Sequence, residues 1–538
     1  MNLLKIKRAL ISVSDKTGIV ELGRFLTAMG CEIISTGGTR TILENEGIPT
    51  TEISTVTGNP EAFGGRMKTI SFKIESALLY NRAVDQAEAD RLNIEPIDLV
   101  ICNLYPFEQV ANQGVDCDTL IENIDIGGPT MIRAAAKNFK WVTVVTAPED
   151  YAELQLELTN EKGRISYEYR KKMMVKAFNH TADYDALIAT TMDKQIGTDS
   201  LRLSFERGYP LRYGENSHQS ATCYRERKHN YSLFDLEVLH GKALSFNNIL
   251  DINAAIESIQ KSARVACSVV KHSNPCGFAE ADDQRRALEL AWAGDPISAF
   301  GSIVAFNKTL TLDTVQFFDL SCEDRSKRKF VEVITAPKVE AEALAYLQVH
   351  KNLRVVELDS TQLSETRDYR YVNGALLAQD QDNVSFEQLL VVTKRTLELN
   401  KTQGLIEFGL RAVRNIKSNA IAIVREKQGA YQLLGMGAGQ PNRLLATKLA
   451  IEKCRENMKL EFTGSREAFD AFAKAILATS FLISDAFLPF ADNIELAAAE
   501  GIRHVVQPGG SIRDQSVIKK CNELAVAMVF TGTRHFKH

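Results

Sequence analysis

The first 150 residues alternate short apolar segments with amphipathic ones, and this alternation constrains the fold more than any other feature of the sequence. The pattern predicts strands at residues 9–15, 31–36, 97–107 and 141–148, and helices at residues 18–29 and 39–46. Strands that alternate with helices form a parallel sheet with helices on both faces. Polar residues follow several of these strands, at the edge where ligands bind in open α/β sheets. The sequence therefore predicts an α/β domain whose site lies at the carboxyl edge of its sheet.

The organisation of the remaining chain indicates further α/β units. At 538 residues, the chain is too long for one core, because domains usually have about 100–200 residues. Residues 149–193 are helical and charged in pattern, and a Gly-, Pro- and Asn-containing segment begins at Gly197, so the main boundary is placed near residue 198. Strands and helices alternate again beyond it. A second set starts near Tyr371, after a dip in composition at residues 351–370.

Composition excludes several classes of protein. The 64 basic and 68 acidic residues give a net charge of −4, which provides no general field for nucleic acid. No apolar run reaches the roughly 18 residues of a membrane span, and the N-terminus lacks the pattern of a signal peptide. The nine cysteines include no CxxC pair. Reduced thiols and a cytoplasmic location are therefore expected.

Two loops in the N-terminal part have the chemistry of a phosphate site. Ser12–Lys16 and Ser35–Thr41 each follow an expected strand and open an expected helix. Hydroxyl groups, a lysine and the free N–H groups of a helix N-terminus suit a phosphate. Each loop alone is typical of a capped βα turn, but two at successive strand ends indicate a shared anion site. Neither loop matches the P-loop or the Rossmann motif.

The segment Lys271–Gly277, KHSNPCG, carries the strongest local signal in the C-terminal part. It follows the apolar run Val265–Val270, so we expect it at the end of a buried strand, followed by a Pro-Gly turn. Lys271 and His272 would then place a cation beside an imidazole, which exchanges protons near neutral pH. Taken alone, such a pair is more often a solvated strand edge. The zinc motif of nucleobase deaminases, P-C-x-x-C, is incomplete after Cys276, so we expect no catalytic zinc.

The motifs resemble one family when they are taken together and in order. They include SVSDK, STGGTRT, GGRMKT, NLYPF, DIGGPTMIRAAAKN, LRYGENSHQ, LSFNN, KHSNPCG, DPISAFGSIVAF, IKSNAIAIV, GMGAGQPNR, SDAFLPFADN and TGTRHF. This series, which covers nearly the whole chain, is similar to the bifunctional purine-biosynthesis enzymes that join an AICAR transformylase to an IMP cyclohydrolase. The resemblance implies a methylglyoxal-synthase-like parallel-sheet domain at residues 1–198. It implies a transformylase domain at residues 199–538, built from two cytidine-deaminase-like α/β units that divide near residues 351–370.

The resemblance also implies site residues. Catalytic roles fall on Lys271, His272 and Asn419 in the transformylase, and on Lys68, Tyr105, Asp125 and Lys137 in the cyclohydrolase. Substrate-binding roles in the cyclohydrolase fall on Ser12, Ser14, Lys16, Ser35, Thr36, Gly37, Thr39, Arg66, Thr69, Asn103 and Gly127. Substrate-binding roles in the transformylase fall on Arg212, Tyr213, His218, Gly301, Gln440, Phe487, Asp492, Asn493 and Arg534.

The implied chemistry has two steps. The formyl group of 10-formyltetrahydrofolate, a co-substrate, passes to the 5-amino group of AICAR, and ring closure with loss of water then gives IMP. The amine is weakly nucleophilic, so a base must remove its proton, for which His272 is the candidate. No catalytic metal, nucleic acid or membrane partner is implied, whereas an intertwined homodimer is.

The sequence departs from the family pattern near the expected cyclohydrolase pocket. Ser71-Phe72 stands where the family commonly has a His-Pro turn, and Glu75-Ser76 stands where it has a His-Gly pair. Phe139 ends the segment AAAKNF, where AAAKNH is usual. These changes alter the expected wall of the pocket and leave Arg66, Lys68, Asp125 and Lys137 in place.

Two other functions are compatible with parts of the pattern. One is a deaminase-like hydrolase fused to a phosphate-binding domain, which the missing second cysteine of the zinc motif opposes. The other is a nucleotide-sensing module without catalysis. Incubation with AICAR and 10-formyltetrahydrofolate distinguishes both from the bifunctional enzyme, because only that enzyme releases tetrahydrofolate and IMP.

Overall fold

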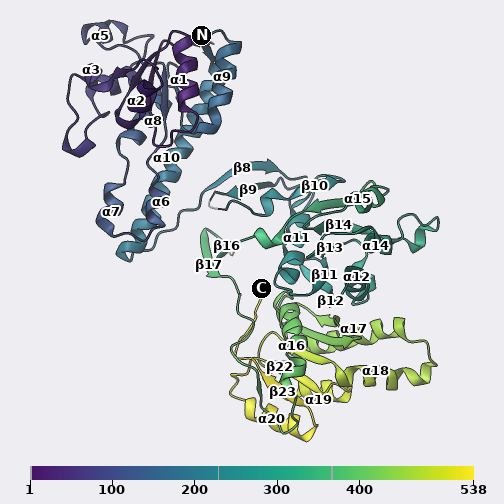
Figure 1. The fold of residues 1–538 in the computed structure, drawn as a ribbon. Coiled ribbons are helices and arrows are strands. Elements are labelled where there is room, and N and C mark those ends of the chain that lie inside the picture. Colours follow the sequence, from purple (N-terminus) through teal and green to yellow (C-terminus); the bar gives the residue numbers. More distant parts are fainter. Residues whose placement is uncertain (1–2, 228, 365–366) are drawn as a thin grey trace. The chain divides into compact units, whose positions relative to one another are not determined.

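The computed structural model describes residues 3–227, 229–364 and 367–538. The chain divides into two compact units, Met1–Ser204 and Phe205–His538 (Figure 1). Each unit has its own buried apolar clusters. Among the described residues, no helix is both long enough and apolar enough to cross a membrane.

The first unit contains the expected parallel sheet. Its described strands are β1 (Leu3–Lys5), β2 (Arg8–Ser12), β3 (Glu32–Ser35), β4 (Thr51–Glu52), β5 (Leu99–Cys102), β6 (Thr143–Val145) and β7 (Arg164–Ser166). Five of them form one sheet in the order β4-β3-β2-β5-β6, and all four pairings are parallel. The prediction of a parallel α/β domain is thus confirmed.

Helices cover both faces of this sheet (Figure 1). The helices within residues 3–204 are α1 (Ile19–Ala28), α2 (Gly37–Asn45), α3 (Ile53–Thr57), α4 (Phe72–Leu79), α5 (Gln86–Arg91), α6 (Phe107–Ala111), α7 (Cys117–Glu122), α8 (Gly127–Lys137), α9 (Tyr151–Asn160) and α10 (Tyr167–Ile196). The strand side chains alternate between two cores, since Leu10 packs with residues of α8 and α10 whereas Ile11 packs with residues of α1 and α9. This alternation follows from the two-residue repeat of a strand.

The segment expected to be helical, residues 149–193, is interrupted by a short strand. β7 pairs antiparallel with β1 and separates α9 from α10. The Ser166 hydroxyl then caps α10 by accepting a hydrogen bond from the Tyr169 N–H at 3.3 Å. α10 ends where Gly197 adopts a left-handed conformation with a φ of 71°, as glycine commonly does after a helix.

The second unit is built on one long sheet. Its strands are β8 (Phe205–Pro210), β9 (Thr222–Glu226), β10 (Glu237–His240), β11 (Val265–Lys271), β12 (Asn274–Ala281), β13 (Ser302–Phe306), β14 (Val331–Ala336), β15 (Arg354–Glu357), β16 (Arg367–Val372), β17 (Ala375–Asp380), β18 (Leu390–Val391), β19 (Ile421–Lys427), β20 (Ala430–Gly437), β21 (Phe481–Ser484), β22 (His504–Gln507) and β23 (Ala527–Phe530). Within residues 229–364 and 367–538, twelve strands join in the order β10-β15-β14-β13-β11-β12-β20-β19-β21-β22-β23-β18.

This sheet contains an internal repeat that the sequence does not reveal. β11 pairs antiparallel with β12 and β13, and parallel pairs follow from β13 to β14 and from β14 to β15. β19 pairs in the same way with β20 and β21, and β21, β22 and β23 follow in parallel. β12 and β20 join the two halves. The predicted pair of similar α/β units is therefore present as a repeated topology.

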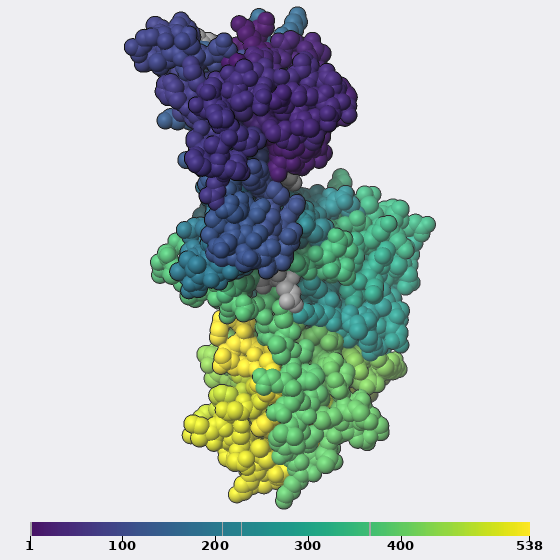
Figure 2. Space-filling view, turned by 60° about the vertical axis from the view of Figure 1, so that its left-hand side comes forward, coloured from purple at the N-terminus to yellow at the C-terminus, as the bar shows by residue number. Residues whose placement is uncertain are grey.

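The helices repeat in the same order. They are α11 (Phe246–Ile259), α12 (Gln284–Trp292), α13 (Pro296–Ala299), α14 (Leu312–Val315) and α15 (Ala341–Leu347) in the first half, and α16 (Leu399–Arg414), α17 (Arg443–Glu461), α18 (Phe469–Thr479), α19 (Asp492–Ala499) and α20 (Asp514–Glu523) in the second. The C-terminal residues pack back onto the segment before β19, where the Ser418 N–H donates to the Lys537 carbonyl at 2.9 Å. Figure 2 shows the C-terminal part, in yellow, directly against the green part of this unit.

One local prediction is wrong, because Pro275 and Gly277 form no turn and instead lie inside strand β12. The pairing register shifts between Val269 and Val270 opposite these residues, and such a bulge tolerates a proline within a sheet. A Cβ on Gly277 would lie 1.9 Å from the Ala291 carbonyl oxygen, so close packing against α12 requires glycine there. The same relation recurs in the second half, where a Cβ on Gly437 would lie 2.0 Å from the Ala446 carbonyl oxygen.

The segment near Tyr371 also differs from expectation, because it does not start the second half of the sheet. β16 and β17 form a separate antiparallel hairpin. Asn373 and Gly374 make its turn with φ values of 42° and 86°, which is the turn that Asn-Gly favours. The second half of the sheet begins with β18 and α16 instead.

Candidate active sites

In the first unit, the loops after β2 and β3 meet at the carboxyl edge of the parallel sheet. The Thr39 hydroxyl donates to the Val13 carbonyl at 3.0 Å and accepts from the Val13 N–H at 3.2 Å. The Ser12 and Thr36 hydroxyls lie 3.4 Å apart, and the Ser35 hydroxyl donates to the Ile11 carbonyl at 2.9 Å. Thr36 immediately precedes α2, so the N–H groups of the first turn of α2 are available beside these hydroxyls.

Asn103, which follows β5, fixes the first of these loops from the other side. Its Oδ1 accepts from the Ser14 and Asp15 N–H groups at 2.5 and 3.0 Å, and its Nδ2 donates to the Asp15 carbonyl at 2.9 Å. The Lys16 ammonium folds back to the Ser14 carbonyl at 3.1 Å, and burial lowers the pKa of Lys16. In this structure, Asn103 bonds the loop backbone and thereby holds the candidate anion site in place.

Lys68 reaches the second loop. A Cβ on Gly37 would lie 2.6 Å from Lys68 Nζ, so glycine at this position makes room for the ammonium. The same ammonium forms an ion pair with Glu61 at 3.2 Å. Arg66, two residues earlier, pairs instead with Glu122 and is exposed. The GGRMKT segment thus contributes Lys68 to the phosphate loops and directs Arg66 to α7.

Asp125 and Tyr105 form the polar centre of this cluster. Asp125 Oδ1 accepts from the Gly128 N–H at 2.8 Å, at the start of α8. Burial raises the pKa of Asp125, an effect that its hydrogen bonds to the Gly128 and Tyr105 backbone partly offset. Burial, followed by the charge of Asp125, raises the pKa of Tyr105. A carboxylate whose pKa is shifted toward neutrality suits proton transfer.

Gly127 and Thr69 close the cluster, whereas Lys137 lies outside it. A Cβ on Gly127 would lie 2.6 Å from Thr69 Oγ1, so the GGRMKT segment packs directly on the start of α8. Lys137 is exposed at the last residue of that helix. The ten helical rises from Gly127 place Lys137 about 15 Å away along the helix axis. Within one chain, the structure does not bring Lys137 to Asp125.

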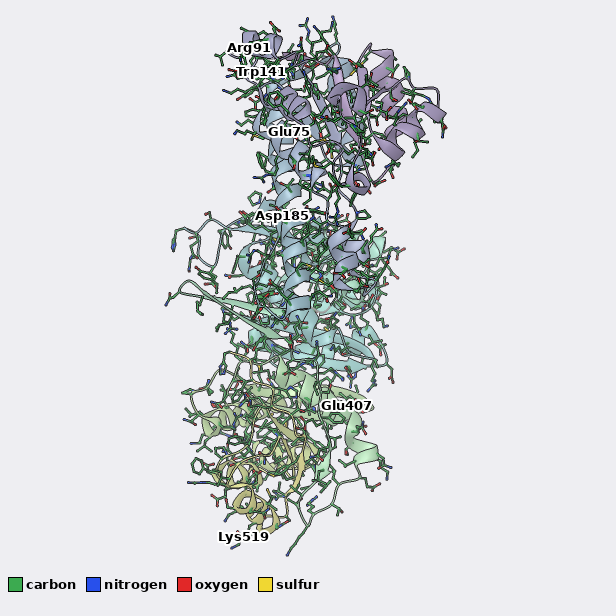
Figure 3. All side chains as sticks on the ribbon, turned by 90° about the vertical axis from the view of Figure 1, so that its left-hand side faces the viewer. Glu75, Arg91, Trp141, Asp185, Glu407 and Lys519 are labelled. Atoms are coloured by element: carbon green, nitrogen blue, oxygen red, sulfur yellow. The ribbon has the colours of Figure 1, made fainter. Side chains whose placement is uncertain are left out.

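Three of the departures from the family pattern, Ser71, Phe72 and Glu75, line a neighbouring cavity of about 680 Å³. Its wall includes Lys68, Ile70, Ser71, Phe72 and Glu75. Ser71 caps α4 by accepting from the Ile74 N–H at 3.1 Å, and Glu75 lies in the first turn of that helix (Figure 3). Glu75 Oε1 is buried and has no hydrogen-bond partner among the described residues. Burial raises the pKa of Glu75.

Another departure, Phe139, packs on α10. Its ring packs against the Tyr167 ring with centroids 5.4 Å apart. Its carbonyl accepts from Arg170 Nε at 3.0 Å. Phe139 therefore connects the end of α8 to α10 and does not contribute to the wall of the phosphate loops.

In the second unit, Lys271 and His272 lie at a tight turn between β11 and β12. His272 and Ser273 both have left-handed backbones, with φ values of 54° and 60°, which a two-residue hairpin of this kind requires. The equivalent turn of the second half is Gln428-Gly429, with φ values of 54° and 78°. A left-handed residue other than glycine carries a cost of about 1–2 kcal/mol, so the His-Ser turn is conformationally less favourable than its counterpart.

Neighbouring groups hold this turn in place. The Ser273 N–H donates to Asp251 Oδ1 at 2.7 Å, from α11. Asn274 Oδ1 accepts from the Lys417 N–H at 3.0 Å, which links the turn to the second half. Lys271 Nζ donates to the Phe300 carbonyl at 2.7 Å, next to Gly301. The His272 side chain is exposed. The structure therefore brings Lys271, His272 and Gly301 to the segment that contains Asn419.

Asn419 has partners at both ends of its amide. Its Nδ2 donates to the Gln440 carbonyl at 2.8 Å, and its Oδ1 accepts from Arg443 Nη2 at 2.7 Å. Arg443 also pairs with Asp485, which is fully buried. Arg443 and Asp485 were missed as functional candidates from the sequence, although they lie within the GMGAGQPNR and SDAFLPFADN motifs. An arginine beside a Gly-rich turn and an acid after a strand were the available signals.

The remaining candidates of the second half lie on segments that are linked to Asp485 or to Arg443. The Asp485 carbonyl accepts from the His535 N–H at 2.8 Å, which places the adjacent Arg534 nearby. Phe487 follows two residues after Asp485 and is partly exposed. Asn493 accepts from the Thr447 hydroxyl at 2.8 Å, and the Asp492 carboxylate bonds the backbone and amide of Asn493. These residues therefore form one neighbourhood with Asn419 and Gln440.

Arg212 and Tyr213 contact the segment at the start of α11, and His218 lies in the same loop between β8 and β9. The Arg212 N–H donates to the Leu244 carbonyl at 3.1 Å, and the Phe246 N–H donates to the Tyr213 carbonyl at 3.1 Å. The Arg212 guanidinium lies 5.3 Å from the centre of the Tyr213 ring. Arg212 and His218 are exposed. Across the described residues, no group of three or more His, Cys, Asp or Glu side chains could hold a metal ion.

Comparisons with known proteins cover both units. The family described as "AICARFT/IMPCHase bienzyme" matches residues 135–453, and the family described as "MGS-like domain" matches residues 18–130. The second match confirms the expected methylglyoxal-synthase-like fold of the N-terminal part.

Full-length relatives are also similar. The "Bifunctional purine biosynthesis protein PurH" of Persephonella marina is 42% identical over 543 residues, covering 99% of this chain and 100% of the relative. The protein of the same name from Acetivibrio thermocellus is 44% identical over 546 residues, with coverage of 99% and 100%. A solved structure, "Crystal structure of ForH", is 31% identical with a TM-score of 0.32, and the match covers 35% of this chain and 99% of that chain.

Proposed function

This chain belongs to the AICARFT/IMPCHase bienzyme family, and we propose that its two reactions take place at the two residue clusters described above. It transfers the formyl group of 10-formyltetrahydrofolate to AICAR and then closes formyl-AICAR to IMP, with release of water. One observation carries the proposal: the candidates for each reaction gather in a different compact unit. We assign residues 1–198 to ring closure and residues 199–538 to formyl transfer.

For formyl transfer, His272 removes the proton of the 5-amino group as nitrogen attacks the formyl carbon. Lys271 stabilises the negative charge that develops on the formyl oxygen or protonates the departing folate nitrogen. Asn419 supplies a hydrogen bond to an oxygen that gains charge. Arg212 and Arg534 suit the nucleotide phosphate or the carboxylates of the folate. The exposure of His272 supports this role, because its ring is accessible to a ligand.

Substrate contacts complete the proposed transformylase site. The proposed substrate-binding residues come from the β8–β9 loop and from both halves of the long sheet; they are Tyr213, His218, Gly301, Gln440, Phe487, Asp492 and Asn493. The hydrogen bond between Asn274 and Lys417 supports the assignment, because it holds the turn that contains His272 against the segment that contains Asn419, just before β19.

For ring closure, the carboxamide nitrogen attacks the formyl carbon within one molecule. The main demand is therefore a fixed orientation of the reacting groups. Asp125 takes the proton from nitrogen, and Lys68 and Tyr105 stabilise the oxyanion that leaves as water after protonation. The loops Ser12–Lys16 and Ser35–Thr39 hold the phosphate, and α2 presents its N-terminus to it. The raised pKa of Asp125 supports its role in proton transfer.

The remaining cyclohydrolase contacts are assigned to Arg66, Thr69, Asn103 and Gly127. Lys137 is assigned to the oxyanion as well, although it lies at the far end of α8 within its own chain. That role requires a second copy of the chain to supply the lysine.

A homodimer and a cytoplasmic location complete the proposal. The hairpin of β16 and β17 exposes Tyr371 and Leu377, which are 74% and 57% accessible, and an apolar hairpin of this kind suits burial against a second copy. Sedimentation of the purified protein should give twice the chain mass; a monomer at micromolar concentration would contradict the dimer. The free state of all nine cysteines supports a reducing compartment, and cell fractionation tests this assignment.

The two-site assignment is tested by separating the half-reactions. The full chain with AICAR and 10-formyltetrahydrofolate should release tetrahydrofolate and IMP. A fragment of residues 1–198 should convert added formyl-AICAR to IMP without folate. If the fragment folds, as judged by circular dichroism, but forms no IMP, the assignment of ring closure to the first unit is wrong.

A further inference from the structure

The side-chain amide of Asn419 has only one orientation that is consistent with its partners. Its Oδ1 lies 2.7 Å from Arg443 Nη2, and its Nδ2 lies 2.8 Å from the Gln440 carbonyl oxygen. A guanidinium only donates hydrogen bonds and a carbonyl only accepts them. The reversed amide would therefore place donor against donor and acceptor against acceptor. The donor and acceptor chemistry of the two partners therefore fixes the orientation of the amide.

Arg443 is itself held firmly. Its side chain is 7% exposed, and its Nη1 donates to Ser484 Oγ at 3.0 Å and to the fully buried Asp485. Asp485 Oδ2 also accepts from the Ala420 N–H at 3.1 Å and from the Ser418 hydroxyl at 2.5 Å. Both neighbours of Asn419 in sequence are therefore bonded to the carboxylate that pairs with Arg443. The two terminal nitrogens of the guanidinium bond different partners: Nη1 bonds Asp485, and Nη2 bonds Asn419.

We propose that Arg443 is a positioning residue for formyl transfer. By binding Oδ1 of Asn419, it orients the Asn419 amide to donate a hydrogen bond to the oxygen that gains negative charge. The inference rests on the proposed function of Asn419 and deepens it. After bonding Gln440, Nδ2 keeps one N–H for a ligand, while Oδ1 faces Arg443. The cation also polarises the amide and strengthens the remaining donor, because hydrogen bonds in a chain reinforce one another.

The ligand group that fits is an oxygen acceptor, and the formyl oxygen of the folate co-substrate matches this chemistry. When the amine adds, a carbon–nitrogen bond forms and the carbonyl electron pair moves onto that oxygen. The pair then returns to re-form the carbonyl, the bond from the formyl carbon to the folate nitrogen breaks, and that nitrogen takes up a proton to give tetrahydrofolate. His272 takes the amine proton. A donor aimed at this oxygen lowers the barrier, whereas an acceptor there would raise it. Loss of one such donor typically costs about 10²–10³-fold in kcat.

The test uses Arg443→Lys in the full-length protein. Lysine keeps a positive charge for Asp485, but its single ammonium replaces the two terminal nitrogens of the guanidinium. The variant therefore loses the hydrogen bond to Asn419. We expect kcat for formyl transfer to fall about 10–100-fold, with KM for AICAR changed less than about threefold, because the lost interaction acts in the transition state. Ring closure of added formyl-AICAR should be unchanged and shows that the other unit is active.

The matched control is Arg425→Lys. Arg425 is a buried arginine of β19 that bonds Gln432 Oε1 at 2.8 Å and pairs with Glu461, away from the candidate residues. The same exchange there should leave the kcat of formyl transfer unaltered. An equal fall in both variants would mean that loss of a buried arginine disturbs the fold, and the positioning role would be rejected.

A double-mutant cycle separates positioning from a general structural effect. In an Asn419→Ala background, Arg443→Lys should cause no further fall in kcat, because Arg443 acts through Asn419. Asn419→Asp, which keeps an oxygen for Arg443 and lacks the N–H, should lose as much kcat as Asn419→Ala. Additive falls, or an active Asn419→Asp variant, would overturn the inference. If Asn419→Ala itself transfers formyl at the normal rate, the proposed role of Asn419 fails instead.

Discussion

Replacement of Asp125 by asparagine is expected to remove the base of ring closure and leave the fold intact. The asparagine Oδ1 can still accept the Gly128 N–H that Asp125 accepts at 2.8 Å, so the start of α8 keeps its hydrogen bond. A general base contributes about 10²–10⁴-fold. At 1.36 kcal/mol for each factor of ten, this corresponds to about 2.7–5.4 kcal/mol of barrier. Exchange of a charged for a neutral acceptor changes the contribution of a hydrogen bond to stability by only about 1–2 kcal/mol.

The assay is conversion of formyl-AICAR to IMP across a pH series. Burial raises the pKa of Asp125, so the wild-type rate should fall as the pH drops through this raised value and the carboxylate takes up a proton. Asp125→Asn should be slower by at least about 10²-fold and should lack this acidic limb. Asp116→Asn is the matched control, since Asp116 also accepts a backbone N–H three residues ahead, from Thr119 at 2.8 Å, at the start of α7. A near-normal rate for Asp125→Asn, or an unchanged acidic limb, would refute Asp125 as the base.

Four further predictions follow from the same geometry. His272→Ala should lower formyl transfer at least about 10²-fold and spare ring closure, as measured in separate half-reactions; full retained transfer would remove His272 from the mechanism. Lys68→Ala should lower the single-turnover rate of ring closure more than the affinity for formyl-AICAR, and a pure affinity defect would make Lys68 a phosphate ligand instead. Lys137→Ala should lower the same rate, and a normal rate would remove Lys137 from the mechanism. Burial raises the pKa of Glu75, so the folded state is destabilised once the pH is high enough to ionise this carboxyl group. Glu75→Gln should therefore raise the Tm more at pH 8 than at pH 4. An equal change in Tm at both pH values would contradict this prediction.

The sequence predicts the parallel sheet of the first unit because the relevant information is local. Each strand is a short apolar run beside a helical pattern, and the phosphate loops follow directly. The turn at His272 and Ser273 was misplaced because proline and glycine usually mark turns, whereas Pro275 sits at a bulge and Gly277 packs against α12. Such contacts depend on distant parts of the chain, so local pattern does not show them.

The sequence analysis did not identify Arg443 and Asp485 in the candidate site of the second unit for the same reason. Arg443 and Asp485 are 42 residues apart and pair only in the folded chain. Neither residue type stands out, since buried arginine–carboxylate pairs also occur as structural features. The internal repeat was hidden because it is a repeat of strand pairing: the two equivalent turns are His272-Ser273 and Gln428-Gly429, which share no side-chain chemistry.

That repeat has a consequence for symmetry. A dimer of two identical half-units would present the same turn on both sides of its two-fold axis, so any group placed on one side would necessarily be copied on the other. Here a single polypeptide contains both halves, and equivalent positions carry different residues. In the proposed transformylase site, His272 and Lys271 come from one half, and Asn419 and Arg443 come from the other. The repeat therefore does not produce two equal sites, because the turn equivalent to His272-Ser273 is Gln428-Gly429, which carries no imidazole.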